Sequence, residues 1–193
     1  MDAAGRVRAA MAAQPRERFL PASERRRASY DGPLAIGHGQ TNSQPRTVRA
    51  MLELLEVRLG QRVLDVGSGS GWTTALLAEL VGPTGMVLGL ERVPDLVLTG
   101  AANLEAAGMP WARIRASVPG VLGAPTEAPF DRVLVSAMAT TLPEPLVAQL
   151  GATGILVAPV AGRMLRVQRD PGAADGRRVT VHGHYRFVPL VPD

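Results

Sequence analysis

Three glycines at alternate positions, Gly67, Gly69 and Gly71, are the residues of this chain whose types and spacing point most directly to chemistry. They follow a short apolar run that contains Asp65, and they precede a helix-forming segment that opens at Thr73. Glycine lets the backbone turn tightly and approach a ligand, and the free amides at a helix N-terminus face whatever lies in the turn. A strand, a glycine turn and a helix in this order predict a nucleotide-sized pocket in an α/β fold.

Glu91 stands 26 positions after Asp65, at the end of the next apolar run. Ligands of parallel sheets bind outside the carboxyl ends of the strands, so this acid belongs to the same predicted site. A carboxylate there accepts two hydrogen bonds from a ribose diol. The dinucleotide fingerprint needs a third glycine where this chain has Trp72, whereas D-x-G-x-G-x-G with a strand-end acid is typical of Rossmann-like S-adenosylmethionine enzymes. A glycine turn that only reverses the chain is the structural alternative.

The elements that must position these residues alternate between apolar runs and segments with helical spacing. Predicted strands cover residues 62–66, 86–91, 112–116, 132–136 and 154–160, and a closing antiparallel pair covers residues 164–168 and 179–187. Predicted helices cover residues 6–13, 44–59, 73–80, 95–107 and 142–150. This order predicts a doubly wound, mostly parallel α/β sheet with an antiparallel C-terminal edge. Together with the glycine motif typical of S-adenosylmethionine enzymes, it indicates a Rossmann-like fold of the class I methyltransferase type.

Residues 16–45 show little strand or helix period. A structureless stretch of this length in a compact domain is typical of a functional loop. It carries Thr41, Asn42 and Ser43 between glycines and prolines, and it leads directly into the predicted core. We therefore predict a substrate loop that acts as a lid and positions the substrate. In the alternative interpretation, Ser43 only caps the helix that follows.

Length and cysteine content narrow the class of protein. The 193 residues suit one α/β domain, with an N-terminal helix and substrate loop in residues 1–45 and the core in residues 46–193. The absence of cysteine excludes disulfides and thiolate chemistry. Three scattered histidines offer no ligand spacing, so we expect no metal site.

Charge and hydropathy exclude two further kinds of partner. The net charge of +4 arises from arginine without any lysine, and the basic residues lack interleaved aromatic residues, which argues against nucleic-acid binding. No apolar run is long enough to span a membrane, so we expect a cytoplasmic protein that does not contact membranes. The oligomeric state stays open.

Beyond the glycine turn, the chain resembles the protein-L-isoaspartate (D-aspartate) O-methyltransferase family over nearly its whole length. The most specific motif is IGHGQTNSQP at residues 36–45, because methyltransferases in general do not share it. Further matching motifs are PRERFLP (15–21), GLER (89–92), APFDRVLVSA (128–137), LPEPLVAQL (142–150) and FVPLV (187–191).

The resemblance implies the transfer of a methyl group from S-adenosylmethionine to the α-carboxylate of an isoaspartyl residue in a damaged protein or peptide. The ester then cyclises to a succinimide, which reopens partly to aspartate, so the reaction is a repair. Carried over by position, the catalytic residues are Thr41 and Ser43, and the substrate-binding residues are His38, Gln40 and Asn42. The implied cofactor-binding residues are Asp65, Gly67, Ser68, Gly69, Gly71, Glu91 and Arg92.

The chain departs from the family after the third predicted strand. Where the family usually has Gly-Asp-Gly, this chain has Val118, Pro119 and Gly120. The aspartate would contact the adenine amino group, and proline offers neither a carboxylate nor an amide donor. We expect cofactor binding to be weaker by about 0.5–3 kcal/mol. Two alternatives to repair stay open: a carboxyl methyltransferase for an aspartate of a dedicated peptide, and a cofactor-binding module without turnover.

Overall fold

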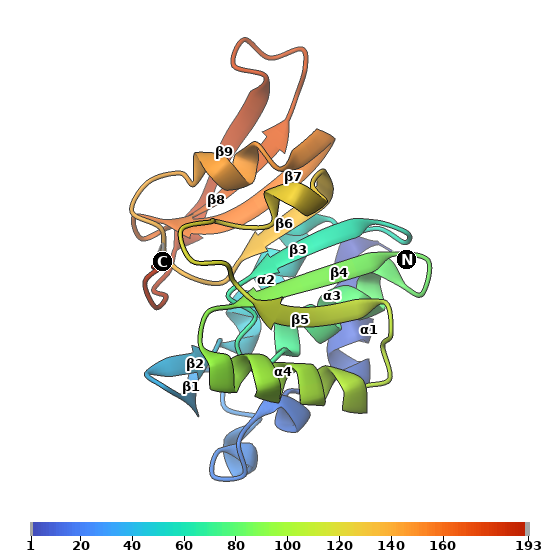
Figure 1. Ribbon diagram of the computed structural model, residues 1–193, viewed down its shortest axis with the longest axis vertical. Coiled ribbons are helices and arrows are strands. Elements are labelled where there is room, and N and C mark those ends of the chain that lie inside the picture. Colours follow the sequence, from blue (N-terminus) through green and yellow to red (C-terminus); the bar gives the residue numbers. More distant parts are fainter. Residues whose placement is uncertain (1, 192–193) are drawn as a thin grey trace.

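A computed structural model describes residues 2–191 of the chain (Figure 1). Within these residues, seven strands form one sheet in the order β5-β4-β3-β6-β7-β8-β9. They are β3 (Arg62–Val66), β4 (Met86–Glu91), β5 (Ala112–Ala116), β6 (Phe130–Val135), β7 (Leu150–Val160), β8 (Arg163–Arg169) and β9 (Arg177–His184). Strands β3 to β7 are parallel, and β8 and β9 add an antiparallel edge. The predicted mostly parallel sheet with its antiparallel C-terminal edge is confirmed.

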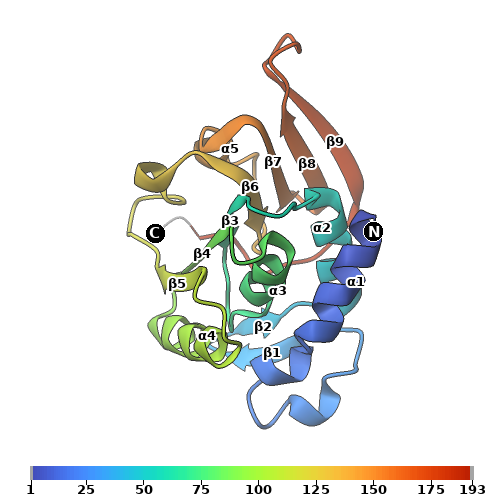
Figure 2. The same ribbon diagram turned by 90° about the vertical axis from the view of Figure 1, so that its right-hand side faces the viewer.

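Helices cover the two faces of the sheet unequally (Figure 2). Alternate residues of a strand face opposite sides, so Val63 of β3 joins the core under the helices α1, α2 and α3, while Leu64 joins the core under α5. The helices are α1 (Ala3–Ala13), α2 (Pro45–Leu55), α3 (Trp72–Val81), α4 (Pro94–Ala106) and α5 (Glu144–Val147). Because α5 is a single turn, loops supply much of the second face.

The stretch 16–45, predicted to be structureless, contains regular structure, so that prediction was wrong. It forms short 3-10 helices at Arg16–Phe19 and Arg25–Arg27 and a hairpin of β1 (Leu34–Gly37) and β2 (Gln40–Asn42). The segment lies against α3 and α4 below the sheet in Figures 1 and 2. Long-range contacts stabilise this segment, such as those of Asn42 with Arg16 and Ser70, and the local periodicity of the sequence does not predict such contacts.

Two predicted helices are shorter than expected. Helix α2 ends at Leu55, because Glu56 adopts a left-handed backbone with φ of 51°, and Leu59 is 71% exposed. Helix α5 covers only Glu144–Val147, and Leu150 already pairs with Phe130 as the start of β7. Sheet pairing at Leu150 therefore outweighs the helical spacing of the apolar residues there.

The last strand also differs from the prediction. β9 covers Arg177–His184 instead of residues 179–187. Near its end Gly183 has a positive φ of 76°, which turns the chain out of the strand direction. Tyr185 and Phe187 then pack against the helix-covered core instead of continuing the ladder. This turn directs residues 188–191 back across the sheet.

Candidate functional site

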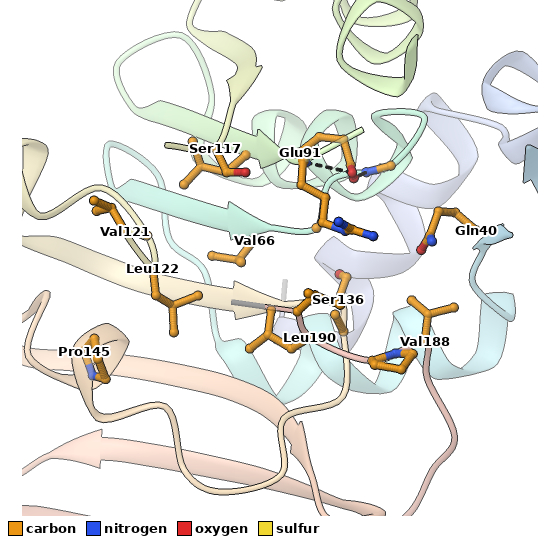
Figure 3. Close-up of a pocket in the computed structure, with 18 of the residues that line it drawn as sticks. Gln40, Val66, Glu91, Ser117, Val121, Leu122, Ser136, Pro145, Val188 and Leu190 are labelled. Carbon is orange, nitrogen blue, oxygen red and sulfur yellow. Dashed lines mark hydrogen bonds between the residues drawn. The ribbon is translucent and has the colours of Figure 1, made fainter. Parts of the chain in front are cut away.

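A cavity of about 530 Å³ lies outside the carboxyl ends of β3, β4 and β6 (Figure 3). Its wall contains Val66 and Glu91, the last residues of β3 and β4, and Ser136, which directly follows β6. We call it the strand-end cavity. Its place, beside the point where the strand order reverses, is where open parallel sheets bind their ligands. Its volume lies within the range of about 300–1,000 Å³ that small ligands occupy.

The glycine turn forms the floor of the strand-end cavity through backbone that other residues rarely adopt. Gly67, Gly69 and Gly71 have positive φ angles of 81°, 54° and 90°. A Cβ atom on Gly71 would also stand 3.0 Å from the carbonyl oxygen of Gly100 on α4. Gly67 and Gly69 line the cavity, whereas Gly71 does not. Gly71 is therefore needed for close packing of α4 on the turn.

Glu91 links the glycine turn to the end of β4. Its Oε2 atom accepts a hydrogen bond of 2.9 Å from the Gly69 amide, and Oε1 accepts from the amides of Arg92 and Val93. The side chain is only 7% exposed, yet it lines the cavity. A carboxylate has about four acceptor positions, so these three bonds leave capacity for a ligand hydroxyl.

Asp65 supports the turn from below instead of facing the cavity. It is completely buried, and its Oδ2 accepts hydrogen bonds of 2.7 Å from the hydroxyls of both Thr73 and Thr74 at the start of α3. Its Oδ1 has no partner among the described residues. Burial raises the pKa of this carboxyl from 3.8 to about 6, against the opposing effect of the two hydroxyls. The geometry favours an indirect role in ligand binding.

The departure at Pro119 takes the form of a tight turn in the wall of the strand-end cavity. The Val121 amide donates a 3.0 Å hydrogen bond to the Val118 carbonyl, and Gly120 has a φ of 73°. Proline followed by a glycine with positive φ is the pattern of a type II turn. Gly120 and Val121 line the cavity, but Pro119 does not. The chain thus builds this wall from backbone and apolar surface.

A buried amide fixes the segment after that turn. The Gln149 Oε1 atom accepts from the Ala124 amide at 2.8 Å, while Nε2 donates to the carbonyls of Leu122 and Pro145 at 2.9 Å each. Leu122 and Pro145 line the cavity together with Gln149 itself. This network holds an apolar wall in place, opposite Glu91.

The C-terminal segment closes the strand-end cavity from the other side. Met138, just after β6, donates from its amide to the Val188 carbonyl, and its carbonyl accepts from the Leu190 amide, both at 2.7 Å. Figure 3 shows Ser136 between Glu91 and the C-terminal residues Val188 and Leu190. The residues 188–191 are therefore part of the site.

A second cavity, of about 550 Å³, adjoins the first; we call it the side cavity. It lies between the start of α2 and the segment 183–188, and Ser43 lines it. Its lining contains Arg46, His184 and Arg186, and among the described residues no carboxylate. Arg46 lies 3.4 Å from exposed Asp31, while Arg186 has no ion pair within residues 2–191. The side cavity therefore suits a ligand with negative charge.

Three hydroxyl groups lie where the two cavities meet. Thr41 and Ser136 line both cavities, and Ser43 lines the side cavity. All three also line a junction cavity of about 30 Å³, whose other wall includes Gly67 and Ser68 of the glycine turn. None of the three hydroxyls has a hydrogen-bond partner in the described part of the chain. They are donors available to a ligand.

Ser136 is the residue that sequence reasoning missed. It directly follows β6, and its amide donates to the Val66 carbonyl at 2.8 Å, beside the glycine turn. If the strand order had been known, the position of Ser136 directly after β6, the neighbour of β3, would have indicated that it lies at the ligand site. Without knowledge of which strands are adjacent, the serine does not stand out.

The predicted cofactor-binding, catalytic and substrate-binding residues reach the site to different degrees. Those that line the strand-end cavity are Gln40, Thr41, Gly67, Gly69, Glu91 and Arg92. Ser68 is buried and lines only the junction cavity. Gln44, not Ser43, is the N-cap residue of α2, and the Arg46 amide in the first turn donates to the Asp31 side chain at 3.1 Å, so the capping interpretation of Ser43 was wrong.

Two predicted substrate-binding residues have protein partners instead. His38, at the tip of the β1–β2 hairpin, places Nε2 3.2 Å from the Asp95 Oδ2 atom at the start of α4. Asn42 is 5% exposed, and its side chain bonds to Arg16 and to Ser70. Asn42 lines the junction cavity, but its side chain is already bonded to protein groups, so the predicted substrate contact stays a prediction.

Two features are absent from residues 2–191. No group of three or more His, Cys, Asp or Glu side chains there is arranged to hold a metal ion. None of the helices in this part of the chain has the length and apolar character needed to cross a membrane.

The fold and the site together define a class I S-adenosylmethionine-dependent methyltransferase. A solved structure of a candidate protein-L-isoaspartate O-methyltransferase from Plasmodium falciparum, in complex with S-adenosyl-L-homocysteine, is similar with a TM-score of 0.82 and 26% identity. The match covers 97% of this chain and 91% of that one. A second structure, a protein-L-isoaspartate O-methyltransferase at 23% identity and a TM-score of 0.80, supports the fold.

Sequence comparison gives the family. The family model described as Protein-L-isoaspartate(D-aspartate) O-methyltransferase matches residues 2–193. The chain is 42% identical over 192 residues to the protein-L-isoaspartate O-methyltransferase of Methanopyrus kandleri, covering 96% of this chain and 83% of the relative. It is 43% identical over 187 residues to that of Methanoculleus marisnigri, with the same coverage. The chain belongs to the protein-L-isoaspartate O-methyltransferase family, and the predicted resemblance is confirmed.

Proposed function

We propose that this protein repairs damaged proteins by methylating the α-carboxylate of isoaspartyl residues, with S-adenosylmethionine as the methyl donor. Family membership supports the activity and the cofactor. The observation that carries the assignment to particular residues is the meeting of two cavities at three free hydroxyls, Thr41, Ser43 and Ser136.

The residues of the strand-end cavity fit S-adenosylmethionine. Glu91 is placed to accept from the ribose hydroxyls, and the glycine turn lets the ligand approach the backbone at Gly67 and Gly69. The apolar wall at Val121 and Leu122 suits a nucleobase face. When bound, the cofactor supplies a methyl group on a positively charged sulfur, which is an electrophile for an oxygen nucleophile.

The acceptor needs no general base. A carboxylate with a pKa of roughly 4 is already ionised at neutral pH, so its oxygen attacks as the anion. Methyl transfer then forms an oxygen–carbon bond while the carbon–sulfur bond breaks, giving a methyl ester and S-adenosylhomocysteine. The protein contributes by aligning oxygen, carbon and sulfur and by excluding water, and alignment of this kind is worth about 7–11 kcal/mol.

We assign the alignment to the three hydroxyls at the junction. Each can donate one hydrogen bond to the substrate carboxylate. Thr41 lies in β2, and the carbonyl of Ser43 accepts from Arg16. A hydroxyl orients the carboxylate while leaving its negative charge in place, whereas a charged donor would neutralise it. Thr41 and Ser43 remain the proposed catalytic residues, and Ser136 joins them.

The side cavity then holds the peptide on either side of the isoaspartyl residue. Its lining of Arg46, His184 and Arg186, with no carboxylate within the described residues, favours substrates with acidic residues near the damaged site. This preference goes beyond the general activity of the family.

The test is methylation with radiolabelled S-adenosylmethionine and matched peptides that contain isoaspartate, aspartate or asparagine at one position. We expect base-labile label on the isoaspartyl peptide alone. Label on the aspartyl peptide would instead identify a tailoring enzyme. Cofactor binding without label on any peptide would overturn the proposed enzyme activity.

A further inference from the structure

Arg16 is a buried arginine that has no ion-pair partner within residues 2–191. It lies in the first 3-10 helix, is 5% exposed, and its guanidinium carbon stands 5.7 Å from the ring centroid of Trp72. Burying a cation is costly unless all its donors are satisfied. Here the Asn42 side-chain oxygen and four backbone carbonyls accept hydrogen bonds from the three guanidinium nitrogens, and no carboxylate of residues 2–191 is among the acceptors.

The acceptors of Arg16 come from the two ends of the hairpin segment. Nη1 donates to the Tyr30 carbonyl at 2.9 Å, and Nη2 donates to the Gly32 carbonyl at 2.9 Å. Nη2 also donates to the carbonyls of Asn42 and Ser43, at 2.8 and 3.0 Å. One planar group therefore fixes the backbone of Ser43, which lines the junction cavity.

A second set of contacts extends from Arg16 to the glycine turn. Its Nε donates to the Asn42 Oδ1 atom at 2.7 Å, and Asn42 Nδ2 in turn donates to the Ser70 hydroxyl at 3.3 Å. Ser70 lies between Gly69 and Gly71, and its carbonyl accepts from Asn103 of α4 at 2.9 Å. The chain of bonds joins the segment that carries the acceptor hydroxyls to the turn that carries the donor site.

We propose that Arg16 is a positioning residue, which sets the distance between the methyl acceptor and the methyl donor through the Arg16–Asn42–Ser70 bridge. The inference rests on the proposed function, because it concerns the geometry of that transfer. Misplacement of a reacting group by about 1 Å costs about 10²-fold in rate. A lysine at this position keeps the charge but cannot reach several carbonyls at once, since it lacks the guanidinium's planar fork.

Arg132 provides a matched control. It is also a 5% exposed arginine that donates to backbone carbonyls, those of Glu56 and Asp131, but it lies at the amino end of β6, away from the site. Arg16→Lys and Arg132→Lys therefore remove the same kind of buried group. Only the first is expected to disturb the junction.

The experiment measures kcat and KM with an isoaspartyl peptide, the Kd of S-adenosylhomocysteine, and amide hydrogen exchange of residues 41–43. We expect Arg16→Lys to lower kcat about 10²-fold and to speed exchange of these amides, with the Kd of S-adenosylhomocysteine unchanged. Arg132→Lys should lower the melting temperature but leave kcat and the exchange of residues 41–43 unchanged.

Equal losses of kcat in both variants, or full kcat in Arg16→Lys, would overturn the proposal. If Arg16→Lys does not fold, Ser70→Ala tests the far end of the bridge, since it removes only the hydroxyl that Asn42 contacts. A fall in kcat without a change in cofactor affinity supports the bridge, and unchanged kcat contradicts it. Hydrogen exchange of residues 41–43 tests the bridge without requiring any catalysis. If the wild-type protein methylates no peptide, the proposed function fails, but the exchange measurement still shows whether the bridge holds these residues.

Discussion

The donor side and the acceptor side of this site are built in contrasting ways. The donor side is a local structure, in which one strand, one glycine turn and the end of the next strand make the floor of the strand-end cavity. The acceptor side joins segments that are distant in sequence, the 3-10 helix of Arg16, the β1–β2 hairpin, the residue after β6 and the C-terminal segment. A site built from residues that are close in sequence forms together with the fold. A site built from distant segments also depends on the hydrogen bonds that join those segments.

The two sides also differ in how they treat charge. On the donor side a buried carboxylate, Glu91, accepts hydrogen bonds from three backbone amides and still lines the strand-end cavity. On the acceptor side the lining of the side cavity contains two arginines and, within residues 2–191, no carboxylate, and three uncharged hydroxyl residues line the junction cavity. We infer that Glu91 selects the cofactor, and that the neutral hydroxyls at the junction orient the substrate beside the arginines of the side cavity.

The largest expected effect is on the donor side. Glu91→Ala removes the proposed ribose contact and the bond that holds Gly69, and hydrogen bonds to a charged group are worth about 1.5–3 kcal/mol. We expect the Kd of S-adenosylhomocysteine to rise about 10- to 100-fold by calorimetry. The exposed Glu105→Ala on α4 is the control and should leave the Kd unchanged. An unaltered Kd in Glu91→Ala would remove this residue from the cofactor site.

On the acceptor side, Ser43→Ala should separate turnover from cofactor affinity. Loss of one hydroxyl donor to the substrate carboxylate is expected to lower kcat about tenfold, with the Kd of S-adenosylhomocysteine unchanged. Ser43→Thr keeps the hydroxyl and should retain most of the activity. Steady-state kinetics with an isoaspartyl peptide make the measurement, and wild-type kcat in Ser43→Ala would return the residue to a purely structural role.

The buried acid beneath the donor side gives a pH dependence of stability. The pKa of Asp65 is raised to about 6 in the folded protein, above its unfolded value of 3.8, so the folded state binds the proton more tightly. Its contribution to stability is therefore fully present below about pH 4 and is lost as the pH rises through 6. Urea unfolding of wild type and Asp65→Asn between pH 4 and 8 should show the wild type losing stability relative to the variant as the pH rises. A constant difference would contradict the assignment.

The smallest expected effect concerns charge in the side cavity. Arg186→Glu should reduce the preference for acidic over basic residues flanking isoaspartate by up to about fivefold in kcat/KM, because exposed ion pairs are worth about 0.2–1 kcal/mol. The preference should weaken with added salt. Arg178→Glu, on β9 but outside the cavity lining and paired with Asp170, is the matched control. If both variants showed the same preference in kcat/KM for acidic over basic flanking residues, Arg186 would not contribute to substrate recognition.

Local patterns predicted most of the donor side. The spacing of Gly67, Gly69 and Gly71 requires a turn with positive φ angles, and the structure has that turn. The periodicity that placed β3 and β4 also placed Glu91 at the correct strand end. The role of Asp65 was not predictable in the same way, because the hydroxyls of Thr73 and Thr74 that hold it become neighbours only when α3 folds back on β3.

The sequence by itself determined the fold class, the cofactor class and the family, because these rest on glycine conformations, apolar periods and motifs that are properties of short segments. Only the tertiary structure decided that residues 16–45 are ordered, that Asn42 faces inward to Arg16, and that Ser136 joins Thr41 and Ser43 at the junction. The physical reason is that a buried guanidinium needs several carbonyls from separate segments at once. No local spacing in the chain records which segments those will be.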